Sequence, residues 1–224
     1  MTNLGDLLTK LALKFGNQST KYFTQEDRVA ALNYARNILG MYDFPELIKT
    51  DDLTFSSTTL NGNTVARATE PTDLARVAKL WNTTSKAEFA YVTNDYFDQM
   101  QTSNTFTREY QSGVRYFFVV PSSTTSLKLR YIKQVTQFVS TTPTAENEFD
   151  SRYDDTIIDG AIGWLSSKRR NFTDYASFDE LYRQKVARMY QDLAYQGGWQ
   201  EHPRLTLYAE KFNVLQTLND ARPF

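Results

Sequence analysis

The sequence contains no cysteine and a single histidine, His202, among its 224 residues. Without cysteine the chain forms no disulfide and offers no thiolate to a metal, and one histidine excludes a site built from several imidazoles. Only nine glycines are present, and neither a P-loop nor a dinucleotide-binding glycine motif occurs. The hydrolase pattern Gly-x-Ser-x-Gly is missing too. We therefore expect no catalytic residue, no cofactor and no metal.

Net charge and long apolar runs are missing as well. The 25 basic and 26 acidic residues give a net charge of −1, whereas a generic nucleic-acid-binding protein is basic. No apolar run approaches the 18 residues that suggest a membrane span. The first residues do not follow the basic-then-apolar pattern of a signal peptide. We expect a soluble, globular protein of a reducing compartment, with no membrane partner.

Helical periodicity is present at both ends of the chain. The apolar spacing predicts four amphipathic helices, over residues 3–15, 24–40, 150–170 and 176–196. In the second helix, Thr24 and Asp27 have the spacing of an N-terminal cap. The apolar faces expected in the last two helices comprise Tyr153, Ile157, Ile158, Ala161, Trp164 and Leu165, and then Phe178, Leu181, Tyr182, Val186, Met189 and Leu193.

The middle of the chain, residues 51–139, has the texture of strands and turns. Asn61-Gly62 is a hairpin signal. A short helix-like run through Leu74, Val77 and Ala78 follows Pro71, then a strand over 87–93 and one or two helical turns over 94–102.

Two further segments, 110–121 and 126–135, read as strands of a hairpin around the loop Pro121–Ser126. Since it carries no chemistry, we interpret this hairpin as an assembly element. Its candidate contact residues are Tyr116, Phe117, Phe118, Leu127, Leu129 and Tyr131.

Residues 199–224 follow the helix-ending pair Gly197-Gly198. They carry apolar side chains without a clear period, and such surface is rarely left in water. One interpretation is an arm that docks on another subunit; the alternative is packing against the chain's own helices. The candidate docking residues are Trp199, Leu205, Leu207, Tyr208, Phe212 and Leu215.

Two charged clusters have both a functional and a structural interpretation. Asp150, Asp154, Asp155 and Asp159 could bind a divalent cation or act as acid and base, but acids also complement the dipole at a helix N-terminus. Lys168, Arg169 and Arg170 could contact a phosphate or a partner, but cations also suit a helix C-terminus.

The order of elements predicts an α+β fold, mainly α. A helical bundle forms from the N- and C-terminal helix pairs, with a central β-rich insertion over 51–139 and an extended C-terminal arm. This order resembles the head–tail connector adaptors of tailed bacteriophages. "LGDLLTKLALKFGN" and "TQEDRVAALNYARNILG" resemble their opening helices, "ATEPTDLARVAKLW" an element after their first β segment, and "EYQSGVRYFFVVPSSTTSLKLRYIK" their mid-chain hairpin. "YDDTIIDGAIGWLSSKRR" and "FDELYRQKVARMYQDL" resemble their closing pair.

The resemblance implies one adaptor domain over 1–198, followed by the docking arm over 199–224. It implies a virion protein made in the host cytoplasm that forms a ring, usually of twelve copies, beneath the portal protein. The ring would line the channel for double-stranded DNA without reading its sequence, and would carry the tail or nozzle proteins. Two alternatives stay open: another neck protein, such as a head-closure or tail-terminator protein, and a metal-dependent enzyme that uses the aspartates.

Overall fold

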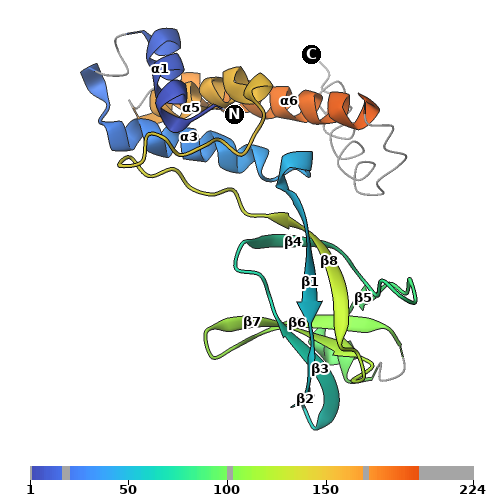
Figure 1. Cartoon of the computed structure of the whole chain (residues 1–224). Helices are drawn as coiled ribbons and strands as arrows, with labels where there is room; N and C mark the ends of the chain where they lie inside the picture. Colours follow the sequence, from blue (N-terminus) through green and yellow to red (C-terminus); the bar gives the residue numbers. More distant parts are fainter. Residues whose placement is uncertain (1, 17–20, 100–102, 169–171, 197–224) are drawn as a thin grey trace, which may run out of the picture.

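The chain is built from a helical half and a strand-rich half (Figure 1). The structure, a computed structural model, describes residues 2–16, 21–99, 103–168 and 172–196; it does not describe the side chains of 172–178 and 193–196. Within these residues it has five α-helices and two β-sheets, which confirms the expected mixture of helix and strand. The helical half contains α1 (Leu4–Phe15), α3 (Gln25–Leu39), α5 (Asp154–Lys168) and α6 (Phe172–Gln196).

Side-chain caps fix where the first two helices begin. At α1, the Asn3 side chain accepts a hydrogen bond from the Asp6 backbone, and Asp6 accepts one from the Asn3 backbone. Thr24 and Asp27 form the same reciprocal pair at α3, which confirms the predicted cap. Each pair satisfies backbone N–H groups that a helix start leaves free, so nearby residues mark both boundaries. At α1, the Leu4 and Gly5 N–H groups donate in addition to the distant carbonyls of Ala145 and Pro143.

The helices share one apolar core, centred on the contact of α3 with α5. Helix α6 approaches α5 so closely at Gly160 that a Cβ atom added there would lie 2.6 Å from the Tyr182 ring. The Tyr182 hydroxyl donates to the Ala35 carbonyl at 2.7 Å, so α6 is tied to α3 as well. Leu181, expected on the buried face of α6, is instead 61% exposed, because Tyr182 and Val186 face the core.

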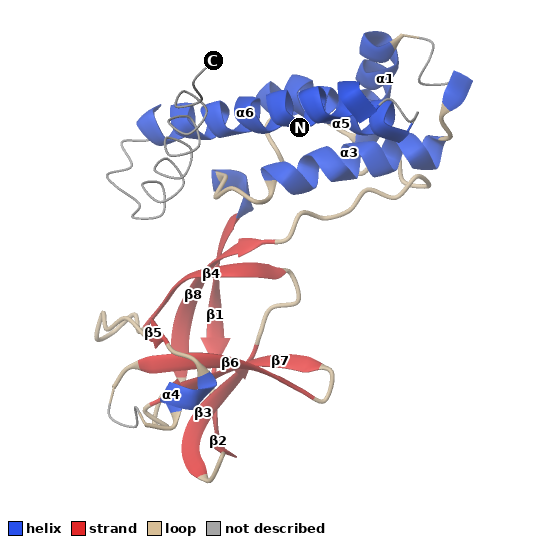
Figure 2. Cartoon of the chain, turned by 180° about the vertical axis from the view of Figure 1, so that it is seen from behind, coloured by secondary structure: helices blue, strands red, loops and turns tan. Residues whose placement is uncertain are grey.

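The strand-rich half contains eight strands in two sheets (Figure 2). The strands are β1 (Ile48–Thr54), β2 (Ser56–Leu60), β3 (Asn63–Thr69), β4 (Leu74–Trp81), β5 (Ala90–Tyr91), β6 (Thr105–Gln111), β7 (Val114–Val120) and β8 (Ser126–Lys133). One sheet has the order β1-β8-β4, and the other has the order β2-β3-β7-β6-β5. All neighbours are antiparallel except β5 and β6. The expected strand over 87–93 thus shrinks to β5, and the helical turn after it is α4 (Asn94–Phe97).

Strand β7 lies at the centre of the larger sheet and is covered on both faces. Phe117 and Val119 point into the core between the two sheets. Phe118 and Val120 point to the opposite face, where they form a second core with Phe97 of α4. The apolar stretch of β7 is therefore central and covered, as its sequence indicates, and strands of the same chain supply most of the cover.

The predicted pairing of the two strands around Pro121–Ser126 is wrong. Strand β7 pairs with β3 and β6, whereas β8 pairs with β1 and β4 in the other sheet. The segment between them turns the chain from one sheet to the other. Strand β7 instead forms a hairpin with β6, and the turn residues Ser112 and Gly113 of this hairpin have φ angles of 51° and 87°. Two successive positive φ angles suit a two-residue hairpin turn, so Ser-Gly was the overlooked signal.

The helix-like run after Pro71 is also wrong, because it forms strand β4. Register shifts interrupt β4 between Leu74 and Arg76 and between Val77 and Lys79. Each bulge adds one residue to the usual two-residue alternation. The apolar residues Leu74, Val77 and Leu80 therefore recur every three residues, a spacing that resembles a helix although the backbone is extended.

Candidate functional site

Two of the aspartates in α5, Asp154 and Asp159, form ion pairs. The buried Asp154 carboxylate accepts hydrogen bonds from the Thr2 hydroxyl and the Lys10 ammonium, both at 2.7 Å. Asp159 pairs with Lys14 and Lys185, each at 2.6 Å. Burial raises the pKa of Asp159, but these two ammonium groups outweigh burial and hold it below its usual value. The acids thus tie α1 and α6 to α5, an arrangement that serves packing rather than proton transfer.

No group of three or more His, Cys, Asp or Glu side chains with the geometry of a metal site occurs among the described residues. Asp150 instead caps the short 3-10 turn at Ser151–Tyr153, where it accepts from the Arg152 backbone at 2.9 Å. Of the four aspartates predicted as a possible cation site, Asp150, Asp154 and Asp159 have separate structural roles, and Asp155 is exposed in the first turn of α5.

Of the basic triplet after α5, the structure describes Lys168. Its ammonium forms an ion pair with Asp27 of α3 and lies 5.3 Å from the centre of the Trp164 ring. That ammonium is the main reason why the pKa of Asp27 is lowered. Lys168 thus connects α5 to α3. Arg169 and Arg170 lie outside the described residues, as does the whole candidate arm over 199–224.

The six candidate residues of the supposed hairpin lie mainly inside the strand-rich half. Phe117, Phe118, Leu127, Leu129 and Tyr131 are at most 1% exposed, and Tyr116 is half-buried. The Tyr131 hydroxyl lies 2.8 Å from a carboxylate oxygen of both Asp51 and Asp73. Burial is the main reason why the pKa of Tyr131 is raised, and the hydrogen bonds to the two carboxylates raise it further. Phe117, Leu127, Leu129 and Tyr131 belong to the core between the two sheets, whereas Phe118 and Tyr116 pack in the second core beside α4. The role of these residues in assembly stays a prediction.

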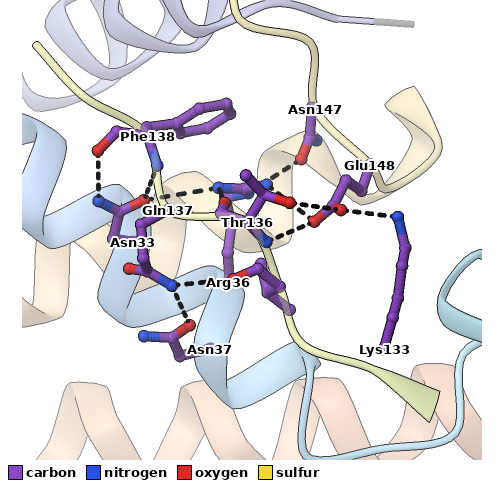
Figure 3. Close-up of polar contacts among 10 residues, drawn as sticks. Asn33, Arg36, Asn37, Lys133, Thr136, Gln137, Phe138, Asn147 and Glu148 are labelled. Atoms are coloured by element: carbon purple, nitrogen blue, oxygen red, sulfur yellow. Dashed lines mark hydrogen bonds and ion pairs between the residues drawn. The ribbon is translucent and has the colours of Figure 1, made fainter. Parts of the chain in front are cut away.

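The joint between the two halves contains a connected network of buried and half-buried polar side chains. Two segments cross it: residues 40–47 lead from α3 into β1, and residues 134–149 return from β8 to α5 (Figure 1). We call the side chains that hold the return segment on α3 the joint network. Its members are Asn33, Arg36, Asn37, Lys133, Thr136, Gln137, Phe138, Asn147 and Glu148 (Figure 3).

Arg36 is the centre of the joint network and is completely buried. Its guanidinium donates to the Thr136 carbonyl at 2.8 Å and to the Asn147 side chain at 3.1 Å, and lies 3.4 Å from Glu148. It also stacks 3.7 Å from the centre of the Phe138 ring. Burial lowers the pKa of Arg36 to about 10, although the negative charge of Glu148 opposes this shift. A guanidinium suits this position because its planar fork reaches several acceptors at once.

Glu148 connects Arg36 to the end of strand β8. Its carboxylate accepts hydrogen bonds from the Lys133 ammonium at 2.7 Å and from the Thr136 backbone and hydroxyl at 2.9 and 3.0 Å. Burial raises the pKa of Glu148, but these contacts outweigh it and lower the pKa overall. Because Lys133 ends β8 and Glu148 precedes α5, this cluster fixes the direction in which the sheet leaves the helices.

Other side chains of α3 near Arg36 also form hydrogen bonds with the return segment. Asn33 and Phe138 form a two-bond clamp: the Asn33 amide donates to the Phe138 carbonyl at 2.9 Å and accepts from its backbone N–H at 2.8 Å. Gln137 donates to Asn37 at 2.8 Å. Periodicity and motifs in the sequence did not predict this site. Its signal was Arg36 itself, a charged residue at helical spacing from Val29, Leu32 and Leu39 on the buried face.

The other segment that crosses the joint, residues 40–47, is held by aromatic packing. The Phe44 ring lies 5.9 Å from Phe149, 5.2 Å from Tyr153 and 5.9 Å from Tyr190 of α6, each in an edge-on arrangement. Edge-on aromatic pairs contribute beyond their buried area. One crossing is therefore held by hydrogen bonds and ion pairs and the other by aromatic packing.

The described residues thus form a helical half and a strand-rich half held together at a packed joint. Residues 2–204 match the family described as SU10 adaptor protein, so the chain belongs to this family of phage head–tail adaptors. The family is not a class of enzymes and implies a structural component of the virion that associates with portal and tail proteins and with copies of itself. No curated protein matches the chain. Among the described helices, none is long and apolar enough to cross a membrane.

Proposed function

We propose that this protein forms the first ring beneath the portal of a tailed phage, lines the DNA channel there and carries the tail. The observation that supports this most is the family match over residues 2–204. The resemblance described above implies a ring of twelve copies. In this proposal, one end of each subunit meets the portal and the other meets the tail or nozzle.

The two-part architecture suits such a ring. Neighbouring subunits in a ring meet through two unlike faces, which requires a heterologous interface that closes by rotation. Exposed apolar side chains occur on both halves: Leu13 and Leu181 on the helical half, and Tyr91, Tyr96 and Tyr110 on the strand-rich half, where Tyr96 belongs to α4. A stiff joint between the halves would transmit the position of the portal to the tail without rearrangement.

The charge balance suits a channel for DNA. A strongly cationic lumen would hold phosphates by releasing their counterions and would slow passage. This chain carries 25 basic and 26 acidic residues, so it offers no general attraction. We expect passing DNA to be contacted without sequence recognition.

Native mass spectrometry of the purified protein mixed with portal rings tests this proposal. We expect an assembly of one portal ring with a fixed number of copies, twelve by the resemblance. Protein alone and portal alone are the controls. A protein that stays monomeric and leaves the mass of the portal ring unchanged would overturn the proposal.

A carboxylate-dependent enzyme is the alternative from another class. It predicts heat on titration with magnesium, calcium or manganese, whereas the ion pairs of Asp154 and Asp159 predict none. A head-closure or tail-terminator protein, the remaining alternative, is expected to be richer in strand and to bind below an existing adaptor rather than to the portal.

A further inference from the structure

The outer face of the three-stranded sheet carries a group of basic side chains. Every second residue of β8, from Leu127 to Tyr131, belongs to the core between the two sheets. Side chains alternate along a strand, so Lys128 and Arg130 point to the outer face. Strand β4 adds Lys79, which lies directly opposite Arg130 in the register of the two strands. We call the basic residues of this surface the cationic face: Arg76, Lys79, Lys128 and Arg130.

Arg130 differs from the other members of the cationic face, because no ion pair among the described residues includes it. The other three are paired, Lys79 with Glu88, Lys128 with Asp52 and Arg76 with Asp43. Like charges directly opposite each other on adjacent strands are destabilising. The exposed Arg130 therefore costs the free subunit stability, which is typical of a residue kept for function. Arginine is also enriched among the residues that dominate binding at protein interfaces.

The two halves of the chain carry net charges of opposite sign. Residues 48–133 contain ten basic and eight acidic side chains, whereas residues 1–47 and 134–196 together contain twelve basic and fifteen acidic ones. Complementary potentials steer two surfaces together and fix their register. The strand-rich half of one copy is therefore attracted to the helical half of another, and the chain belongs to a family whose members associate with copies of themselves.

Glu146 is the corresponding exposed charge on the helical half. It forms a backbone bridge with the N-cap residue of α1, and no ion pair among the described residues includes it. The pKa of Lys10 is raised mainly by its hydrogen bond to Asp154. The charges of Asp6 and Asp155 raise it further, so both acids lie near the same end of the helical half. Asp6 caps α1 and Asp155 complements the dipole of α5, whereas Glu146 lies outside the helices and has neither role.

We propose that Arg130 of one copy pairs with Glu146 of a second copy, so that the cationic face docks on the helical half beside the starts of α1 and α5. A planar guanidinium can bind a carboxylate through two parallel hydrogen bonds, which makes such a pair directional. The two faces differ, so the contact is heterologous and can repeat from copy to copy around a ring. This inference rests on the proposed ring and names the faces by which its neighbouring copies meet.

A stability measurement separates a binding role of Arg130 from a structural one. Arg130→Glu places a carboxylate directly opposite Lys79, so a like-charge pair becomes an opposite-charge pair within the subunit. We expect thermal unfolding followed by circular dichroism to give a Tm equal to or above that of the native chain. A lower Tm would show that Arg130 stabilises the fold, and would overturn the argument that it is kept for binding.

Native mass spectrometry with portal rings measures the contact itself, through the protein concentration that half-saturates the portal. Arg130→Glu and Glu146→Lys should each raise this concentration at least about ten-fold, because each variant places like charges against each other. The double variant restores opposite signs and should return the concentration close to the native value. Lys86→Glu is the matched control, since it makes the same change of charge at an exposed loop position of the same half and should assemble as the native chain does.

The outcomes distinguish this contact from the ring as a whole. Equal half-saturation by the native chain and Arg130→Glu would overturn the contact and leave the proposed ring unaffected. Weaker binding by both single variants without recovery in the double variant would also overturn the pairing. If Arg130→Glu still filled the portal ring but no longer retained added duplex DNA, the cationic face would bind phosphates rather than a second copy. A native chain that did not bind the portal would overturn the ring and the contact together.

Discussion

Replacing Arg36 with methionine should measure what the joint network contributes to the fold. Methionine is unbranched and keeps an apolar contact with Phe138, but it removes the guanidinium and its hydrogen bonds to Thr136 and Asn147. The Thr136 carbonyl and the Asn147 side-chain oxygen then lose a charged donor inside the protein. An unsatisfied buried polar group costs about 1–3 kcal/mol.

The magnitude depends on what happens to Glu148. Removing one partner of a buried ion pair commonly costs about 3–5 kcal/mol, because the other charge stays buried alone. Glu148 keeps its contacts with Lys133 and Thr136, so its negative charge still has hydrogen-bonding partners. We therefore expect Arg36→Met to lower the free energy of unfolding by about 2–4 kcal/mol. For a domain of this size that corresponds to a fall in Tm of about 4–16 °C.

Urea and thermal unfolding followed by circular dichroism provide the assay. Arg28→Met is the matched control, since Arg28 lies on the same helix and makes only a 3.4 Å exposed hydrogen bond to Thr24. The control should change the free energy of unfolding by less than about 0.5 kcal/mol, as surface substitutions do. If Arg36→Met were no more destabilising than Arg28→Met, the joint network would not contribute to holding the two halves together.

Two further predictions concern the same half of the molecule. The pKa of Glu148 is lowered in the fold from its usual 4.5, so its contribution to stability is present above about pH 4.5 and is lost as the pH falls through the lower, folded value. Urea titrations between pH 6 and 3 should therefore show that the free energy of unfolding falls less with pH for Glu148→Gln than for the native chain. The exposed Glu180→Gln is the control, and its free energy of unfolding should depend on pH as that of the native chain does. Gly160→Ala should lower the free energy of unfolding by about 1–2 kcal/mol, because overpacking against Tyr182 exceeds the gain in helix propensity. A urea midpoint equal to or above the native one would refute that packing argument.

Local rules predicted the helices well. The starts of α1 and α3 depend on caps within three residues, so Asn3 with Asp6 and Thr24 with Asp27 could be read from the sequence. Apolar spacing then located α5 and α6 to within a few residues.

Long-range pairing explains what the sequence could not provide. The partners of β7 and β8 lie in separate sheets, and two bulges disguise β4 as a helix. The joint network depends on contacts between residues 100–112 positions apart, such as Arg36 with Thr136 and Glu148. Periodicity reports only which face of an element is apolar, so it cannot identify partners at such distances.

The central claim is that this chain forms the ring between portal and tail, and a cryo-electron microscopy map of the assembled phage neck tests it most directly. We predict a ring of density directly beneath the portal into which copies of this chain fit, each with its helical and strand-rich halves joined at Arg36 as in the free subunit. The claim would be contradicted if the ring beneath the portal were built from a different chain.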